Sequence, residues 1–65
     1  MPMPNGLEII KAAIDDFEDI QKYMLLARKE NATETYAELK TKYLSLKAML
    51  TIAGVNLTDI DKIKE

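Results

Sequence analysis

The stretch from Tyr36 to Gly54 restricts the possible folds of this chain more than any other feature. Its apolar residues recur at alternating steps of three and four, which places them along one stripe of an α-helix. That stripe consists of Tyr36, Leu39, Tyr43, Leu46, Leu50 and Ala53. A second apolar ridge beside it consists of Leu44, Ala48 and Ile52. A helix with two apolar sides needs cover on both, so the pattern predicts a packed helical protein.

An earlier stretch, residues 7–29, predicts another long helix. Its apolar residues also repeat at three and four, with a flanking stripe at seven-residue spacing, so the buried face is wider than a two-stranded coiled-coil seam. Such a face suits a helical bundle. Gln21 is the one polar residue in the main stripe. It either fixes the register of the packed helices or lies at the rim of their interface.

The link between the two stretches is short, which predicts an antiparallel hairpin. Asn31 and Thr35 each begin a capping-box pattern, so the second helix is expected to cover residues 34–53. Gly54 can adopt the left-handed conformation that ends a helix, and Val55 can supply the apolar contact that accompanies such an end.

The last residues predict a short third helix over 58–64. Leu57, Ile60 and Ile63 give this segment one apolar face, and Thr58 with Asp61 has capping-box spacing. The exposed ridge on the second helix is the expected place for that face. We therefore predict an all-α fold in which an antiparallel two-helix hairpin carries a short C-terminal helix packed back on it.

The chain length predicts one small domain that needs a third element or a second copy to bury enough apolar surface. At 65 residues a single core is marginal, and a lone hairpin has only one interface in which to bury apolar surface. We expect residues 7–65 to form one helical domain, residues 1–6, which contain both prolines, to be a disordered lead-in, and two hairpins to dimerise into a helical bundle. The longest apolar run, Met24 to Ala27, is too short to span a membrane, and the N-terminus lacks the pattern of a secretory signal, so a cytoplasmic location is expected.

The composition argues against catalysis. The chain has no His and no Cys, and so lacks the commonest general base, the commonest nitrogen ligand for metals and any thiolate. We expect a non-enzymatic protein without cofactor or metal. Its net charge of −2 provides no long-range attraction to nucleic acid or to an anionic membrane. Binding to protein is the function that remains, as an adaptor, an inhibitor or a regulatory module.

Two groups of residues on the first helix are candidates for that binding. Tyr23, Leu25 and Leu26 fall outside the main stripe and would leave apolar surface exposed on a monomer, which is typical of an interface. The acidic residues Asp15, Asp16 and Asp19 are most simply a solvated helix face, and an acidic docking surface for a basic partner is the alternative. Their spacing on a helix splays them too widely for a divalent-cation site.

A second hypothesis concerns residues 46–64. After Gly54, the apolar residues Val55, Ile60 and Ile63 follow at one, six and nine positions, and in this respect the segment resembles the helix-turn-helix of the Cro and phage-repressor family. The resemblance implies a recognition helix and a DNA-binding role for Lys62 and Lys64. A purely structural corner between two helices produces the same spacing and is the favoured interpretation, because two nearby aspartates would be repelled by phosphate.

Overall fold

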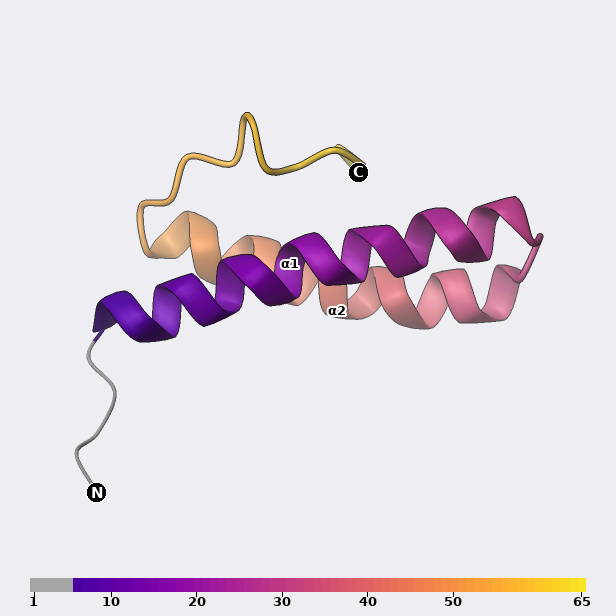
Figure 1. Ribbon diagram of the computed structural model, residues 1–65, viewed down its shortest axis with the longest axis horizontal. Coiled ribbons are helices and arrows are strands. Elements are labelled where there is room, and N and C mark those ends of the chain that lie inside the picture. The colour runs from indigo at the N-terminus through magenta and orange to yellow at the C-terminus, as the bar shows by residue number, and fades with distance from the viewer. Residues whose placement is uncertain (1–5) are drawn as a thin grey trace, which may run out of the picture.

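The computed structural model describes residues 6–65 as a pair of long helices followed by a segment without regular structure (Figure 1). Helix α1 spans Gly6–Lys29 and helix α2 spans Thr33–Ile52. The two helices lie side by side and antiparallel, within overall dimensions of 42 × 28 × 15 Å. No helix in this range is long and apolar enough to cross a membrane. The predicted lead-in falls outside the described residues except for Gly6, which begins α1.

The core lies between the facing stripes of the helices. Its largest fully buried side chains are Phe17 and Met24 from α1 and Tyr43 and Leu50 from α2. The rings of Phe17 and Tyr43 stack with centroids 5.2 Å apart and planes inclined by 12°, which is a favourable offset-stacking distance. Leu46, which the sequence places in the middle of the stripe, is only half-buried.

The link between the helices differs from the predicted capping boxes. Asn31 has a φ of 57°, and the amides of Asn31 and Ala32 donate to the carbonyls of Arg28 and Ala27 at 3.1 and 2.8 Å. This is the hydrogen-bond pattern of a Schellman motif, with asparagine as its left-handed residue. Asn31 therefore ends α1 instead of beginning α2, whose N-cap is Ala32 and makes no side-chain capping bond.

The predicted end of α2 is confirmed to within one residue. Gly54 has a φ of 84°, its amide donates to the Thr51 carbonyl at 3.1 Å, and the Val55 amide donates to the Leu50 carbonyl at 3.0 Å. Val55 packs on the core, as expected for the apolar contact of this motif.

The predicted third helix is wrong. Residues 55–65, which we call the C-terminal strap, form turns, bends and irregular backbone with no helix. The strap runs back along the hairpin (Figure 1), and its apolar side chains pack against the core cluster between α1 and α2 instead of on the ridge of α2. That ridge stays uncovered, and Ile52 on it is 88% exposed. The four packed strap residues are Val55, Leu57, Ile60 and Ile63.

Candidate functional site

Gln21 anchors the strap to α1. Its side chain is 3% exposed, so it does not lie at the rim. Its Oε1 accepts from the amides of Lys62 and Ile63 at 2.6 and 3.0 Å, and its Nε2 donates to the Ile60 carbonyl at 3.0 Å. One side chain thus satisfies three strap backbone groups, which a helix would have satisfied internally. The strap therefore makes these hydrogen bonds to Gln21 in place of the internal bonds of a helix.

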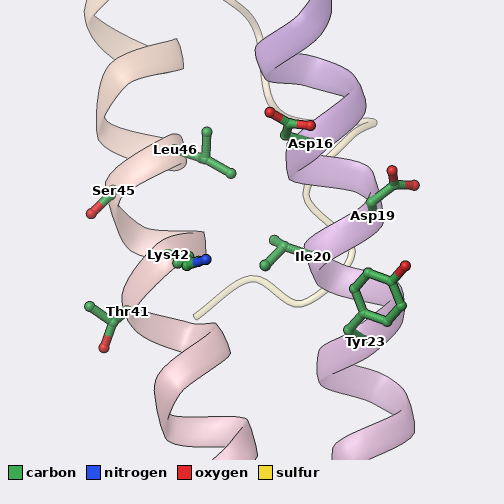
Figure 2. Close-up of a pocket in the computed structure, with 8 residues that line it drawn as sticks. All are labelled: Asp16, Asp19, Ile20, Tyr23, Thr41, Lys42, Ser45 and Leu46. Atoms are coloured by element: carbon green, nitrogen blue, oxygen red, sulfur yellow. The ribbon is translucent and has the colours of Figure 1, made fainter.

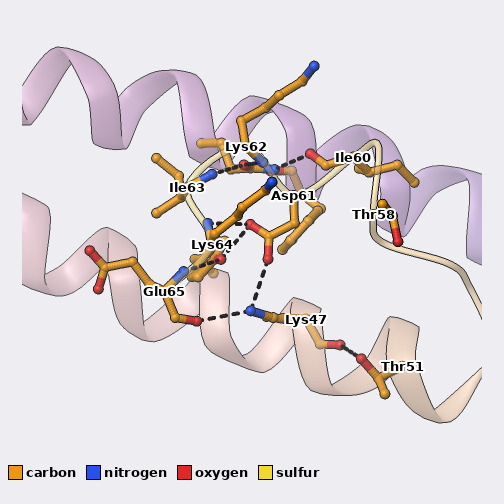
Figure 3. Close-up of polar contacts among 12 residues, drawn as sticks. Lys47, Thr51, Thr58, Ile60, Asp61, Lys62, Ile63, Lys64 and Glu65 are labelled. Carbon is orange, nitrogen blue, oxygen red and sulfur yellow. Dashed lines mark hydrogen bonds and ion pairs between the residues drawn. The ribbon is translucent and has the colours of Figure 1, made fainter.

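Asp61 anchors the strap to α2 (Figure 3). This carboxylate, 6% exposed, accepts from the Tyr43 hydroxyl at 2.6 Å and pairs with Lys47 Nζ at 2.9 Å. It also accepts from the Lys64 amide at 2.8 Å. The Tyr43 hydroxyl in turn accepts from the Glu65 amide at 3.1 Å. The buried charge is therefore paired and fully hydrogen-bonded, which is the condition under which a buried carboxylate is tolerated.

The same contacts shift the pKa values of Asp61, Lys47 and Tyr43. Burial alone would raise the pKa of Asp61, but the bonds from Tyr43 and Lys47 outweigh it and lower that pKa below its ordinary value of 3.8. The pKa of Lys47 is raised, chiefly by its bond to Asp61. Burial, together with the bond to Asp61, raises the pKa of Tyr43. Each shift favours the charge state seen in the anchor near neutral pH.

A more exposed cluster holds the end of the strap. The Glu65 carboxylate pairs with Lys40 Nζ at 2.6 Å and accepts from the Tyr36 hydroxyl at 3.0 Å. Arg28 Nη2 lies 3.4 Å from the same carboxylate and donates to the Tyr36 hydroxyl at 2.7 Å. The bond from Lys40 is the main cause of a lowered pKa at Glu65. Pairs this exposed add little to stability, so Gln21 and Asp61 carry most of the polar anchoring.

We expect strap docking to weaken in acid and in alkali. The folded pKa of Asp61 lies below its unfolded value, so its contribution is present above about pH 4 and is lost as the pH falls through the folded pKa. The raised pKa values of Lys47 and Tyr43 give a contribution present below about pH 10 and lost as the pH rises further. Backbone NMR shifts of Ile63 and Lys64 measured from pH 2 to 11 would follow both transitions.

Two asparagine variants test whether Asp61 causes the acid transition, one as the test and one as its control. Asp61→Asn removes the charge paired with Lys47 and should abolish most of the acid transition, whereas Asp59→Asn changes an exposed strap carboxylate and should leave the transition in place. Strap shifts that stay constant down to pH 2 in the unmodified chain would show that Asp61 does not control docking.

The strap covers one side of the hairpin and leaves a groove on another side (Figure 2). This groove has a volume of about 520 Å³ and is lined by four residues from each helix. Ile20 and Leu46, both half-buried, point into the space between the two helices and form the floor of the groove, with Leu46 nearer the open end. Acidic and hydroxyl groups form its edges, and Lys42 is its one cation. The lining residues are Asp16, Asp19, Ile20, Tyr23, Thr41, Lys42, Ser45 and Leu46.

The structure places Tyr23 and Leu25, two of the three apolar residues that the sequence groups together, in different grooves. Tyr23, Leu25 and Leu26 are all exposed, by 57, 47 and 52%. Tyr23 lines the uncovered groove, whereas Leu25 lines a different groove beside the strap, with Asp59 and Lys62. Leu26 belongs to neither lining. Positions two residues apart on a helix point in nearly opposite directions, so Tyr23 and Leu25 do not share a patch. Leu26, three residues after Tyr23, is its neighbour on the helix surface.

The acidic candidates are also divided. Asp16 and Asp19 lie at the edge of the uncovered groove, and Asp15 is exposed outside it. Within residues 6–65 no group of three or more acidic side chains is placed to hold a metal ion. The groove therefore combines an acidic edge on α1 with an apolar floor.

The DNA-binding hypothesis requires a recognition helix after Gly54, and residues 55–65 contain none. Lys62 and Lys64 lie on the strap, and their amides are engaged by Gln21 and Asp61. Residues 58–64 contain turns where the resemblance implies a recognition helix, so the described chain offers no helix after Gly54 to enter a DNA groove.

Searches of protein-family models, of curated proteins and of solved structures found no match for this chain. The sequence-based candidates missed the anchor formed by Gln21, Tyr43 and Asp61. The available signal was the one polar residue in the main stripe of α1, whose two interpretations the sequence left open.

Proposed function

We propose that this protein acts by binding another protein through the uncovered groove, as an adaptor, inhibitor or regulatory module, and not by catalysis. The observation that carries the proposal is the unequal covering of the hairpin. Its own strap covers the core between the helices on one side, whereas the groove on the other side exposes Tyr23 and the edges of Ile20 and Leu46.

Further apolar surface continues the groove along both helices. Ile9, seven residues before Asp16, and Met49, three residues after Leu46, fall on the same faces by helical spacing and are 52 and 43% exposed. A run of exposed apolar side chains edged by polar groups is typical of a protein interface. Asp61 and Glu65, whose carboxyl groups have a lowered pKa, both hold the strap, and neither lines this groove. Their positions support binding over acid–base chemistry.

Site-specific photo-crosslinking tests the proposal. Benzoylphenylalanine in place of Tyr23, irradiated in the cells that make the protein, should join it to another polypeptide chain, of its own kind or a different one. The same substitution at Leu25, similarly exposed but beside the strap, is the matched control and should give little crosslinking. No crosslinked product from position 23, or equal yields from both positions, would contradict binding through this groove.

A further inference from the structure

We infer that the occupant of the uncovered groove is a second copy of this chain, with α1 of each copy lying across α2 of the other. The inference rests on the proposed function and names the partner at the same surface. It follows from the positions of the charges in the groove, because the two edges carry opposite signs.

The edge formed by α1 is negative and the side formed by α2 carries a positive charge. Asp16 and Asp19 come from α1 and Lys42 from α2, and all three are exposed and line the same stretch of groove. Along the hairpin, Lys42 lies level with Ile20, next to the height of Asp19, whereas Asp16 lies further toward the open end (Figure 2). Glu38 lies one helical turn before Lys42, toward the closed end of the hairpin and beyond the two carboxylates.

These charges are self-complementary about one kind of twofold axis. Rotating a copy by 180° about an axis parallel to the helices lays its α2 over the first copy's α1 without changing its height. Lys42 of each copy then faces α1 of the other copy beside Asp19, with Asp16 on the same negative edge toward the open end. Every helix also has antiparallel neighbours, as in an up-and-down four-helix bundle, and Ile20, Tyr23 and Leu46 meet in the centre.

The other face-to-face arrangement is disfavoured by the same charges. An axis perpendicular to the helices lays α1 over α1 and α2 over α2. Asp16 and Asp19 of the two copies would then approach one another, and so would the two copies of Lys42. Like charges across an interface oppose association, so the parallel axis is the one selected.

Sedimentation equilibrium on the purified full chain tests this arrangement. The unmodified protein should be a dimer at high concentration. Lys42→Glu, and separately the double variant Asp16→Lys/Asp19→Lys, should each raise the dimer dissociation constant about tenfold or more, because each turns two attractive contacts into two repulsive ones. An equimolar mixture of the two variants should restore dimers, since both contacts are attractive again in the mixed pair.

The control is Lys62→Glu, which makes the same change in net charge on the strap side and should leave the dissociation constant unaltered. All substituted side chains are exposed, and recovery of association in the mixture shows that the variants are folded. A dimer whose affinity does not change in either groove variant would overturn the proposed axis. A chain that is monomeric at every concentration would overturn self-association, while crosslinking of Tyr23 to a different protein would still support the proposed function.

Discussion

Leu50→Ala is expected to lower the free energy of unfolding by about 2 to 5 kcal/mol. Leu50 is fully buried in the last turns of α2 and belongs to the core cluster formed with Phe17 and Tyr43. Removing its side chain loses the apolar transfer energy and leaves a cavity between two helices that cannot collapse freely. Small domains have about 5 to 15 kcal/mol in total, so the loss is a large share of the stability. Urea unfolding followed by circular dichroism measures it.

Alanine variants of two other leucines of α2 are the controls for Leu50→Ala. Leu44 is 44% exposed on the uncovered ridge, so Leu44→Ala should change the free energy of unfolding by no more than about 0.5 kcal/mol. Leu46 is half-buried in the uncovered groove and should fall between the two. Equal costs at Leu44 and Leu50 would mean that the buried face of α2 has been assigned incorrectly.

The helices were predictable because the information that forms them is local. Apolar spacing sets their lengths, and the predicted ranges 7–29 and 34–53 differ from the observed ones by no more than one residue at each end. Gly54 ended α2 as expected, because its left-handed conformation is intrinsic to glycine. The capping-box interpretation of Asn31 is wrong, since an asparagine suits both an N-cap and the left-handed position after a helix, and here it takes the second.

The strap was not predictable in the same way. Spacing of Leu57, Ile60 and Ile63 suits a helix, and only contacts with distant residues decide against it. Gln21 bonds to strap backbone groups 39, 41 and 42 residues away. No local pattern encodes such pairings. The uncovered groove depends on them too, because the side of the hairpin chosen by the strap determines which side is left for a partner.

Gln21→Leu is expected to detach the strap and to lower the free energy of unfolding by about 2 to 4 kcal/mol. The amides of Lys62 and Ile63 and the carbonyl of Ile60 would all lose their partner. Each unpaired buried group costs about 1 to 3 kcal/mol, so three together exceed the roughly 1.5 to 3 kcal/mol gained by burying a leucine. The strap can avoid that cost only by moving into water, which uncovers part of the core.

Hydrogen exchange separates this outcome from general destabilisation. Amides of residues 60–65 should lose their protection in Gln21→Leu, while amides in the middle of α1 and α2 should remain protected under the same conditions. Lys22→Leu is the matched control, because it adds the same side chain at the adjacent, exposed position and should leave strap protection unchanged.

Gln21→Glu distinguishes the two halves of the anchor. A glutamate can still accept from the amides of Lys62 and Ile63, but its second carboxylate oxygen cannot donate and would lie against the Ile60 carbonyl oxygen with a buried charge. This variant should therefore also lower the protection of the strap amides. Strap amides that stay protected in Gln21→Leu would show that apolar packing of Ile60 and Ile63 holds the strap without the glutamine. In that case Gln21 would not determine which side of the hairpin the strap covers. The apolar contacts of the strap alone would determine it, and with it the position of the uncovered groove.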